Sequence, residues 1–343
     1  MTAARQAGIR ADDVTVSVVL PTLNERAHIR DCLDSLLVQD FPGVVEILVV
    51  DGGSTDGTRE VVEGEGGVVR LLDNPEVSAA AAMNVGIGAA RAEVICRADA
   101  HTLYAPNYVR RCVEVLLESG AANVGGRMQA VGTTSFGRAV AAVTSSRIGV
   151  GPGRFHYLAE RAEVETVYLG CWWRQTLVDV GGYDTENLQW AAEDQELNFR
   201  LRRAGGRVLI DPSIHSWYFP RDNPRALLRQ YSNYGVAKAS TLAKHRTLPY
   251  WRPLAPAALV AAAALSLVLP GRWRLRALAL VVGPWSSVAA AESMRLSKDP
   301  GVAWHRAFGA LAICHWGYGV GFWRGVVRFV SGRGFDARPR RGR

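Results

Sequence analysis

Polar side chains gather directly after two of the chain's apolar runs. Pro21-Thr22-Leu23-Asn24-Glu25 follows residues 14–20, and Asp51-Gly52-Gly53-Ser54-Thr55-Asp56-Gly57-Thr58 follows residues 44–50. Both clusters are candidate nucleotide contacts. The second could also be only a turn in which Ser, Thr or Asp caps the next helix. Because a polar cluster follows each of two successive strands, a binding site is favoured over a simple turn.

Two further constellations could do chemistry. Asp99 and His101 lie two residues apart, so a carboxylate and an imidazole could face one divalent ion. Mg²⁺ favours oxygen ligands, whereas Mn²⁺ also accepts an imidazole, so the pair favours Mn²⁺. A strand-end turn with a solvated histidine is the alternative. Glu193 and Asp194 precede a helical stretch, where a carboxylate can act as a general base or complement the helix dipole.

Alternating strands and helices would position these residues. The apolar runs 14–20 and 44–50 are rich in β-branched residues, and residues 26–38 between them are amphipathic. The alternation continues with a helix from 57, a strand over 68–72, a helix over 79–91 and a strand over 92–97. This pattern predicts an α/β fold with a mainly parallel sheet, which holds ligands outside the carboxyl ends of its strands. No Gly-x-Gly-x-x-Gly follows the first strand, so a dinucleotide-binding Rossmann domain is disfavoured.

Four motifs within residues 14–221 resemble those of family 2 glycosyltransferases, which have the GT-A fold, a mainly parallel sheet flanked by helices. Their order and spacing are specific, although each motif alone is not. The motifs are Val16-Ser17-Val18-Val19-Leu20-Pro21-Thr22-Leu23-Asn24-Glu25, Val49-Val50-Asp51-Gly52-Gly53-Ser54-Thr55-Asp56-Gly57-Thr58, Arg97-Ala98-Asp99-Ala100-His101, and Glu193-Asp194 with Glu196-Leu197-Asn198-Phe199-Arg200-Leu201-Arg202. Asp99-Ala100-His101 and the trailing hydrophobic segments resemble bacterial succinoglycan-type glucosyltransferases, which extend lipid-linked oligosaccharides.

The resemblance implies an inverting, metal-dependent transfer of a hexose, from a nucleotide diphosphate sugar such as UDP-glucose. Asp51 would accept a hydrogen bond from the base or ribose, and Asn84 would close the pocket. Asp99 and His101 occupy the family's Asp-x-Asp position and would hold Mn²⁺, or Mg²⁺, against the diphosphate. His215 resembles an extra metal-binding histidine of some GT-A enzymes, or is simply a packed or exposed side chain. The residues expected to contact the nucleotide sugar are Pro21, Thr22, Asn24, Glu25, Asp51, Asn84 and Asp99.

The acceptor side follows from the same resemblance. Asp194 is expected to be the general base, with Glu193 contacting the acceptor or holding its loop. A glycine-rich loop over 149–153 could be a flap over the sugar or an ordinary turn. Processive synthases of the family carry Gln-x-x-Arg-Trp, and the missing Arg-Trp after Gln230 argues against a polymerising enzyme. The expected acceptor and lipid contacts are Trp172, Arg221, Arg229 and Gln230, although one of Trp172 and Trp173 should be core and the arginines could merely snorkel.

Charge and apolar runs divide the chain. The net charge is +8, and residues 251–343 carry 14 lysines and arginines against three acids, which is +11 and leaves −3 for residues 1–250. The basic part also contains long uncharged runs, which indicates a membrane rather than nucleic acid as partner. The five cysteines are far apart, which argues against a disulfide scaffold and favours a reducing compartment.

Three apolar runs, residues 254–270, 277–291 and 307–323, contain 17, 15 and 17 residues. At 1.5 Å per residue, 17 residues reach about 25 Å against a hydrocarbon core of ~30 Å, so each run is short for a crossing. A soluble second domain of buried alanine-rich helices is the alternative. The basic tail and the enzyme domain should share the cytoplasmic side, so the number of crossings should be even, with at least one segment re-entrant or in-plane.

These patterns predict a protein at the inner, cytoplasmic membrane with its catalytic domain on the cytoplasmic side. The family resemblance implies that its acceptor is a lipid-linked saccharide of cell-surface polysaccharide biosynthesis. Transfer directly to polyprenyl phosphate and a non-catalytic role in a polysaccharide assembly complex are the alternatives. The expected divisions are a disordered lead over 1–13, a GT-A domain over 14–222, an amphipathic interfacial region over 223–250, membrane-associated helices over 251–330 and a basic tail over 331–343.

Overall fold

The structure is a computed structural model that describes residues 9–150, 156, 158–186, 192–246 and 252–331. The chain divides into two compact units. Unit 1 comprises Met1–Gln129, Arg154–Thr185 and Glu193–Tyr218, and unit 2 comprises Ala130–Gly153, Glu186–Ala192 and Phe219–Arg343. The sequence predicts a GT-A domain over 14–222. Within that range, residues 130–153 belong to unit 2, where Val140 and Val143 pack in the same cluster as residues from the C-terminal helices.

Within the described residues, unit 1 is built on a nine-stranded mixed sheet flanked by helices, which confirms the predicted fold class. The strand order is β3-β2-β1-β4-β8-β6-β9-β5, and β7 pairs with β9. The strands are β1 (Val16–Thr22), β2 (Val44–Asp51), β3 (Val69–Asp73), β4 (Val94–Arg97), β5 (Thr102–Tyr104), β6 (Asn123–Ala130), β7 (Ala162–Glu163), β8 (Tyr168–Trp173) and β9 (Val208–Tyr218). The helices are η1 (Ala11–Asp13), α2 (Ile29–Leu37), α3 (Thr58–Glu63), α4 (Ala79–Ala89), α5 (Tyr108–Ser119), α8 (Arg174–Asp179) and α9 (Glu193–Arg203).

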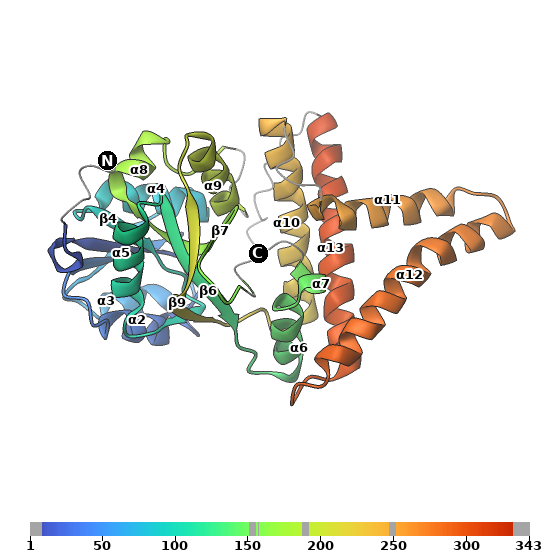
Figure 1. Ribbon diagram of the computed structural model, residues 1–343, viewed down its shortest axis with the longest axis horizontal. Helices are drawn as coiled ribbons and strands as arrows, with labels where there is room; N and C mark the ends of the chain where they lie inside the picture. Colours follow the sequence, from blue (N-terminus) through green and yellow to red (C-terminus); the bar gives the residue numbers. More distant parts are fainter. Residues whose placement is uncertain (1–8, 151–155, 157, 187–191, 247–251, 332–343) are drawn as a thin grey trace. The chain divides into compact units, whose positions relative to one another are not determined.

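The first four strands pair in parallel, and β4, β5, β6 and β7 each make an antiparallel pair with β8 or β9. Alternate residues of β1 face opposite sides of the sheet, as the period of a strand requires. Val18 packs in one core with α2 and α5, and Val19 packs in the other with α4. Both faces are therefore covered (Figure 1), which explains why these strands are continuous apolar runs.

Two predicted details of unit 1 differ from the structure. The apolar stretch 207–210 predicts a strand that ends before Asp211 and Pro212, but the strand continues as β9 to Tyr218, because Ser216, Trp217 and Tyr218 pair with β5. His215 therefore lies on a strand and not after one. Residues 1–8 of the expected lead lie outside the described residues, whereas Ala11–Asp13 form η1, and Ile9 and Ala11 pack against the core.

Unit 2 is helical in its described residues. Its longest helices are α10, α12 and α13, and Asn223 caps α10 by accepting a hydrogen bond from the Ala226 amide at 2.9 Å. The elements are α6 (Ser135–Thr144), α7 (Arg147–Val150), α10 (Pro224–His245), η3 (Arg252–Leu254), α11 (Ala255–Leu267), α12 (Arg272–Leu296) and α13 (Trp304–Val330).

Helices α10 and α13 pack closely through small residues. A Cβ atom on Gly235 would overlap the carbonyl oxygen of Tyr318, and one on Gly321 would overlap that of Ser232. Glycine is needed at these two positions because backbone faces backbone there. The third apolar run of the sequence thus supplies one face to a protein interface, with Ala310, Leu311 and Cys314 among its buried residues.

Helices α11 and α12 form a hairpin that diverges from α13 in unit 2 (Figure 1). Among the described helices, only α12 has both the length and the mean hydropathy of a membrane crossing, and 17% of its most apolar stretch is buried. Large apolar side chains stand exposed on the hairpin, including Val268 at 77%, Leu275 at 70% and Leu280 at 77%. Trp251 and the arginine tail lie outside the described residues.

Candidate active site

Three parallel strands of unit 1, β1, β2 and β4, place the first three sequence motifs at one edge of the sheet. Strand β1 lies between β2 and β4, with Thr22 in register with Asp51 and Val19 in register with Arg97. The loops that carry the first three motifs follow the carboxyl ends of these neighbouring strands. This is the edge at which an open α/β sheet binds ligands.

Backbone and side-chain hydrogen bonds join the first two motif loops. The Asn24 side-chain oxygen accepts from the Thr55 amide at 2.9 Å, and the Asn24 amide donates to the Ser54 hydroxyl at 2.8 Å. The Glu25 amide donates to the Thr58 hydroxyl at 2.8 Å. Asn24 has a φ of 56°, a left-handed conformation that asparagine tolerates better than most residues. The two predicted walls of a nucleotide pocket are therefore adjacent.

Asp51 is 1% exposed, and its carboxylate is used within its own loop. It accepts hydrogen bonds from the Gly53 and Ser54 amides at 2.9 Å, from the Ser54 hydroxyl, and from the Arg59 guanidinium at 3.1 Å. Burial alone would raise the pKa of Asp51, but the hydrogen bonds from Ser54, Arg59 and Gly53 outweigh it and lower the pKa. Asp51 is thus an anion that shapes the loop, as the turn interpretation of this cluster expects.

The third motif meets the first through a histidine and a glutamate. The His101 Nδ1 atom lies 2.8 Å from the Glu25 carboxylate, and the His101 amide donates to Asp99 Oδ1 at 3.1 Å. The Asp99 amide also donates to the Tyr104 hydroxyl at 2.7 Å, which anchors the loop. Asp99, His101 and Glu25 therefore lie in neighbouring loops.

The metal-binding set expected from the sequence is only partly gathered. Across the described residues, no group of three or more His, Cys, Asp or Glu side chains is arranged to hold a metal ion. His215 is exposed on β9 and is not grouped with Asp99 and His101. The residues that remain to contact an ion are Asp99 and His101, which is one carboxylate and one imidazole.

The acidic pair at the start of α9 is joined to β4 by an arginine that the sequence motifs do not single out. Arg97 Nη2 donates to Glu193 Oε1 at 2.9 Å, and both side chains are nearly buried. Asp194 accepts a hydrogen bond from the Gln195 amide at 2.7 Å. Burial, followed by the charge of Glu193, raises the pKa of Asp194 to about 6, while Arg97 opposes the rise. A carboxylate with this pKa suits a general base near neutral pH.

Asn84 is bonded to a turn of the chain, and Trp172 lies in the core. The Asn84 amide group donates to the Tyr183 carbonyl at 2.9 Å and accepts from the Tyr183 amide at 2.8 Å, so it fixes the turn at Tyr183. Trp172 is 0% exposed in the core that contains Leu177, so it cannot touch an acceptor. Trp173 is also buried, whereas only one of the pair was expected to be core.

The other predicted acceptor residues belong to unit 2. Arg221 and Arg229 are exposed, and the Gln230 amide donates to the Tyr234 hydroxyl at 3.1 Å. The glycine-rich loop falls largely outside the described residues, which end at Val150 and resume at His156.

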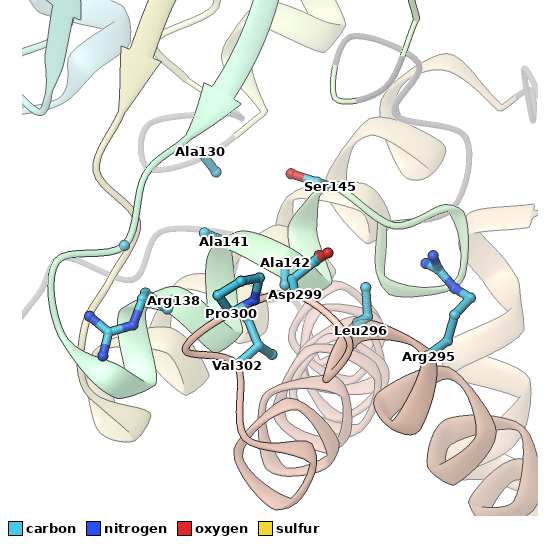
Figure 2. Close-up of a pocket in the computed structure, with 11 residues that line it drawn as sticks. Ala130, Arg138, Ala141, Ala142, Ser145, Arg295, Leu296, Asp299, Pro300 and Val302 are labelled. Atoms are coloured by element: carbon cyan, nitrogen blue, oxygen red, sulfur yellow. The ribbon is translucent and has the colours of Figure 1, made fainter.

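A separate pocket of about 380 Å³ lies within unit 2 (Figure 2). Arg138 and Arg295 lie at its sides, and Leu296 and Val302 contribute apolar surface. Arg138 already donates to the Gly301 and Thr133 carbonyls, and Arg295 already pairs with Glu292. The pocket contains none of the predicted site residues.

Comparisons with known proteins identify relatives of the whole chain. Residues 17–173 match the family model described as glycosyl transferase family 2. The chain is 31% identical to the succinoglycan biosynthesis protein ExoA of Rhizobium meliloti, over 91% of this chain and 95% of that protein.

More distant relatives have related descriptions. A dolichyl N-acetyl-alpha-D-glucosaminyl phosphate 3-beta-D-2,3-diacetamido-2,3-dideoxy-beta-D-glucuronosyltransferase of Methanococcus voltae is 26% identical over 67% of this chain and 74% of its own. Among solved structures, a mannosyltransferase from Pyrobaculum calidifontis, in complex with GDP-Man and Mn²⁺, has a TM-score of 0.55 and 21% identity over 92% of each chain. That likeness confirms the fold.

Proposed function

The chain belongs to glycosyltransferase family 2, and from this premise we propose that it is an inverting, metal-dependent hexosyltransferase of cell-surface polysaccharide biosynthesis. The donor is a nucleotide diphosphate sugar, UDP-glucose first among them, and the acceptor is a lipid-linked saccharide. The similarity to a succinoglycan biosynthesis protein supports a role in polysaccharide biosynthesis. The name of the Methanococcus voltae relative supports a saccharide acceptor carried on a lipid phosphate.

One observation carries this proposal. The loops after three neighbouring parallel strands are tied to one another, through Asn24 with Thr55 and through His101 with Glu25. The acidic pair of α9 joins the same group through Arg97 and Glu193. These contacts support the proposal, because they link the residues proposed for nucleotide binding, for metal binding and for proton transfer within unit 1.

The nucleotide would lie against the joined loops 21–25 and 51–58. Pro21, Thr22 and Asn24 would form one wall, and the ionised Asp51 would form the other. The Asp51 side chain is 0% exposed and its oxygens already accept bonds from Gly53, Ser54 and Arg59, so a base or ribose would reach this carboxylate by displacing one of those donors. A charge-assisted hydrogen bond of this kind contributes about 1.5–3 kcal/mol.

Asp99 and His101 would hold the divalent ion, with Mn²⁺ preferred over Mg²⁺ because one ligand is an imidazole. Glu25 beside His101 Nδ1 would orient the ring, as carboxylates orient metal-binding histidines elsewhere. When bound, the ion supplies charge neutralisation for the departing diphosphate.

Asp194 would remove the proton from the acceptor hydroxyl as its oxygen attacks the anomeric carbon. The new glycosidic bond forms on one face of the sugar while the bond to the diphosphate breaks on the other, so the configuration inverts in one step. The raised pKa of Asp194, about 6, leaves the carboxylate ionised at neutral pH and basic enough to take this proton.

The membrane attachment is proposed for the hairpin of α11 and α12. Arg272, Trp273 and Arg276 are exposed at the start of α12, and both guanidinium groups lie over the Trp273 ring. Tryptophan and arginine are typical of the membrane interface, and the exposed leucines and valines nearby would enter the apolar layer. The catalytic unit would then work at the cytoplasmic face.

The test is a donor and acceptor panel. Purified protein with Mn²⁺ and membrane lipid extract is incubated with separate nucleotide sugars, and nucleotide release is followed for the wild type and Asp194→Asn. We expect release with one donor class and a loss of about 10²–10⁴-fold in the variant, since its amide cannot accept the proton. Unchanged turnover in Asp194→Asn would exclude Asp194 as the base, and no release with any donor would exclude the transferase activity.

A further inference from the structure

Arg97 is a nearly buried cation between two groups of site residues. It ends β4, two residues before Asp99, and its side chain is 11% exposed. Its Nη2 atom donates to Glu193, and its Nε and Nη1 atoms are buried with no acceptor among the described residues. Burying a guanidinium that is only partly hydrogen-bonded is costly, so its presence at this position needs an explanation.

Three elements hold this guanidinium in place. Strand β4 supplies its backbone, α9 supplies Glu193, and the Tyr183 ring lies 6.0 Å from the guanidinium carbon. The Tyr183 backbone is itself held by two hydrogen bonds with the Asn84 side chain on α4, one donated and one accepted by Asn84. An ion pair on the surface would not need Asn84 to hold Tyr183 beside the guanidinium.

We propose that Arg97 is a positioning residue that orients the acidic pair of α9, so that Glu193 is held against β4 and Asp194 is presented as the proton acceptor. This inference rests on the proposed function. In this arrangement Glu193 binds Arg97 and not the acceptor. Asn84 supports the arginine indirectly, because it holds Tyr183. Arg97 acts through Glu193 and Asp194 and need not touch the substrates.

The charges around Asp194 support this arrangement. The groups that face it are Glu193 on its own helix, Arg97 on β4 and Tyr183 on the preceding turn. Burial and the Glu193 charge raise the pKa of Asp194, and the Arg97 charge lowers it. Removing Arg97 should therefore raise the pKa further, and removing the Glu193 charge should lower it. The two shifts have opposite signs because the two neighbours carry opposite charges, so finding both would place Arg97 and Glu193 beside Asp194 in the folded protein.

The first experiment measures the pH dependence of kcat/KM with Mn²⁺, lipid extract and the nucleotide sugar that the wild type uses. We expect the acid limb of Arg97→Gln to move to higher pH by about one unit, with kcat lower by at least tenfold. Arg97→Lys should keep the wild-type midpoint, and Glu193→Gln should move it to lower pH. Arg70→Gln is the matched control, because Arg70 pairs with the buried Glu46 and should leave the midpoint unchanged.

A second measurement needs no turnover. The raised pKa of Asp194 means that its ionisation opposes folding. The melting temperature of the wild type should therefore fall relative to that of Asp194→Asn as pH rises from about 4 to 6. In the Arg97→Gln background this loss should extend to higher pH, and in the Glu193→Gln background it should end at lower pH.

The outcomes separate the two proposals. If the wild type turns over no nucleotide sugar, the proposed function fails, and the melting comparison still decides whether Arg97 acts on Asp194. If Arg97→Gln does not fold, Arg97→Met, which removes the same charge and leaves an unbranched apolar side chain in the buried site, gives the same decision. Midpoints that do not move, or that move in the same direction for Arg97→Gln and Glu193→Gln, would overturn the role of Arg97.

Discussion

Hydrogen bonds within the site occupy many of the polar groups that the motifs supply. Asp51 bonds its own loop, Asn24 bonds the neighbouring loop, and Asn84 bonds Tyr183. A buried polar group without a partner is costly, so motif residues that do not touch a ligand are used to shape the loops that do. At the residue scale, the motifs therefore contain both supporting residues and candidate contacts.

His101 provides a test of metal preference, because it stands where the family has a second aspartate. We expect His101→Asp to shift activity from Mn²⁺ towards Mg²⁺, since it replaces an imidazole with a carboxylate. The measurement is the ratio of transfer rates with the two ions. His215→Ala should leave the ratio unchanged, because His215 is not grouped with Asp99 in the described residues. An unaltered ratio in His101→Asp would argue against His101 as a ligand.

At the scale of elements, neighbouring parallel strands place distant motifs together. Strand β1 lies between β2 and β4, so residues near positions 22, 51 and 97 emerge beside one another. Helix α9 adds the acidic pair from much later in the chain through the contact of Glu193 with Arg97. In unit 2, the glycine contacts of α10 with α13 determine how closely these helices approach.

The helix contact in unit 2 makes a prediction about stability. Gly321→Ala should lower the free energy of unfolding by about 1–3 kcal/mol, because the new methyl group would overlap the Ser232 backbone. Gly309→Ala lies on the same helix with open space around the added carbon, so it should be neutral or stabilising by up to about 1 kcal/mol. Thermal unfolding followed by circular dichroism in detergent compares the two. Equal melting temperatures would show that the close contact does not hold α10 to α13.

At the scale of the whole molecule, charge is separated along the chain, with +11 in residues 251–343 and −3 in the remainder. Arginines at 272, 274 and 276 are exposed at one end of α12, next to exposed apolar side chains. This combination of charge and apolar surface is typical of a segment that binds an anionic membrane surface.

Replacing Arg272, Arg274 and Arg276 with glutamine should weaken binding to vesicles that contain phosphatidylglycerol. Each arginine near such a surface contributes about 1 kcal/mol, so the triple variant should bind roughly 10²-fold more weakly. Flotation of the purified chain with anionic and with neutral vesicles measures the effect. Arg30→Gln, which removes an exposed cation of unit 1, is the control. Equal flotation of the triple variant and the wild type would place the membrane contact elsewhere.

The sequence alone determined the family, the α/β fold and the early strands and helices, because apolar periodicity and turn residues are local properties. Strands β1, β2 and β4 lie within two residues of their predicted ranges. The motif residues could also be identified from the sequence, because the chemistry of a side chain follows from its residue type. Arg97 begins the motif Arg97-Ala98-Asp99-Ala100-His101, and an arginine at the end of a buried strand was the signal that could have identified it.

The tertiary structure decided which residues meet. Pairing of Arg97 with Glu193 joins positions 96 residues apart, and no local pattern encodes such a contact. Burial of Trp172 depends on its central strand being covered on both faces, and the use of Asn84 depends on the turn at Tyr183 lying beside α4. The last apolar run became part of a helix interface, because its glycines fit the backbone of α10. Long-range packing decides these outcomes, and it depends on the whole chain at once.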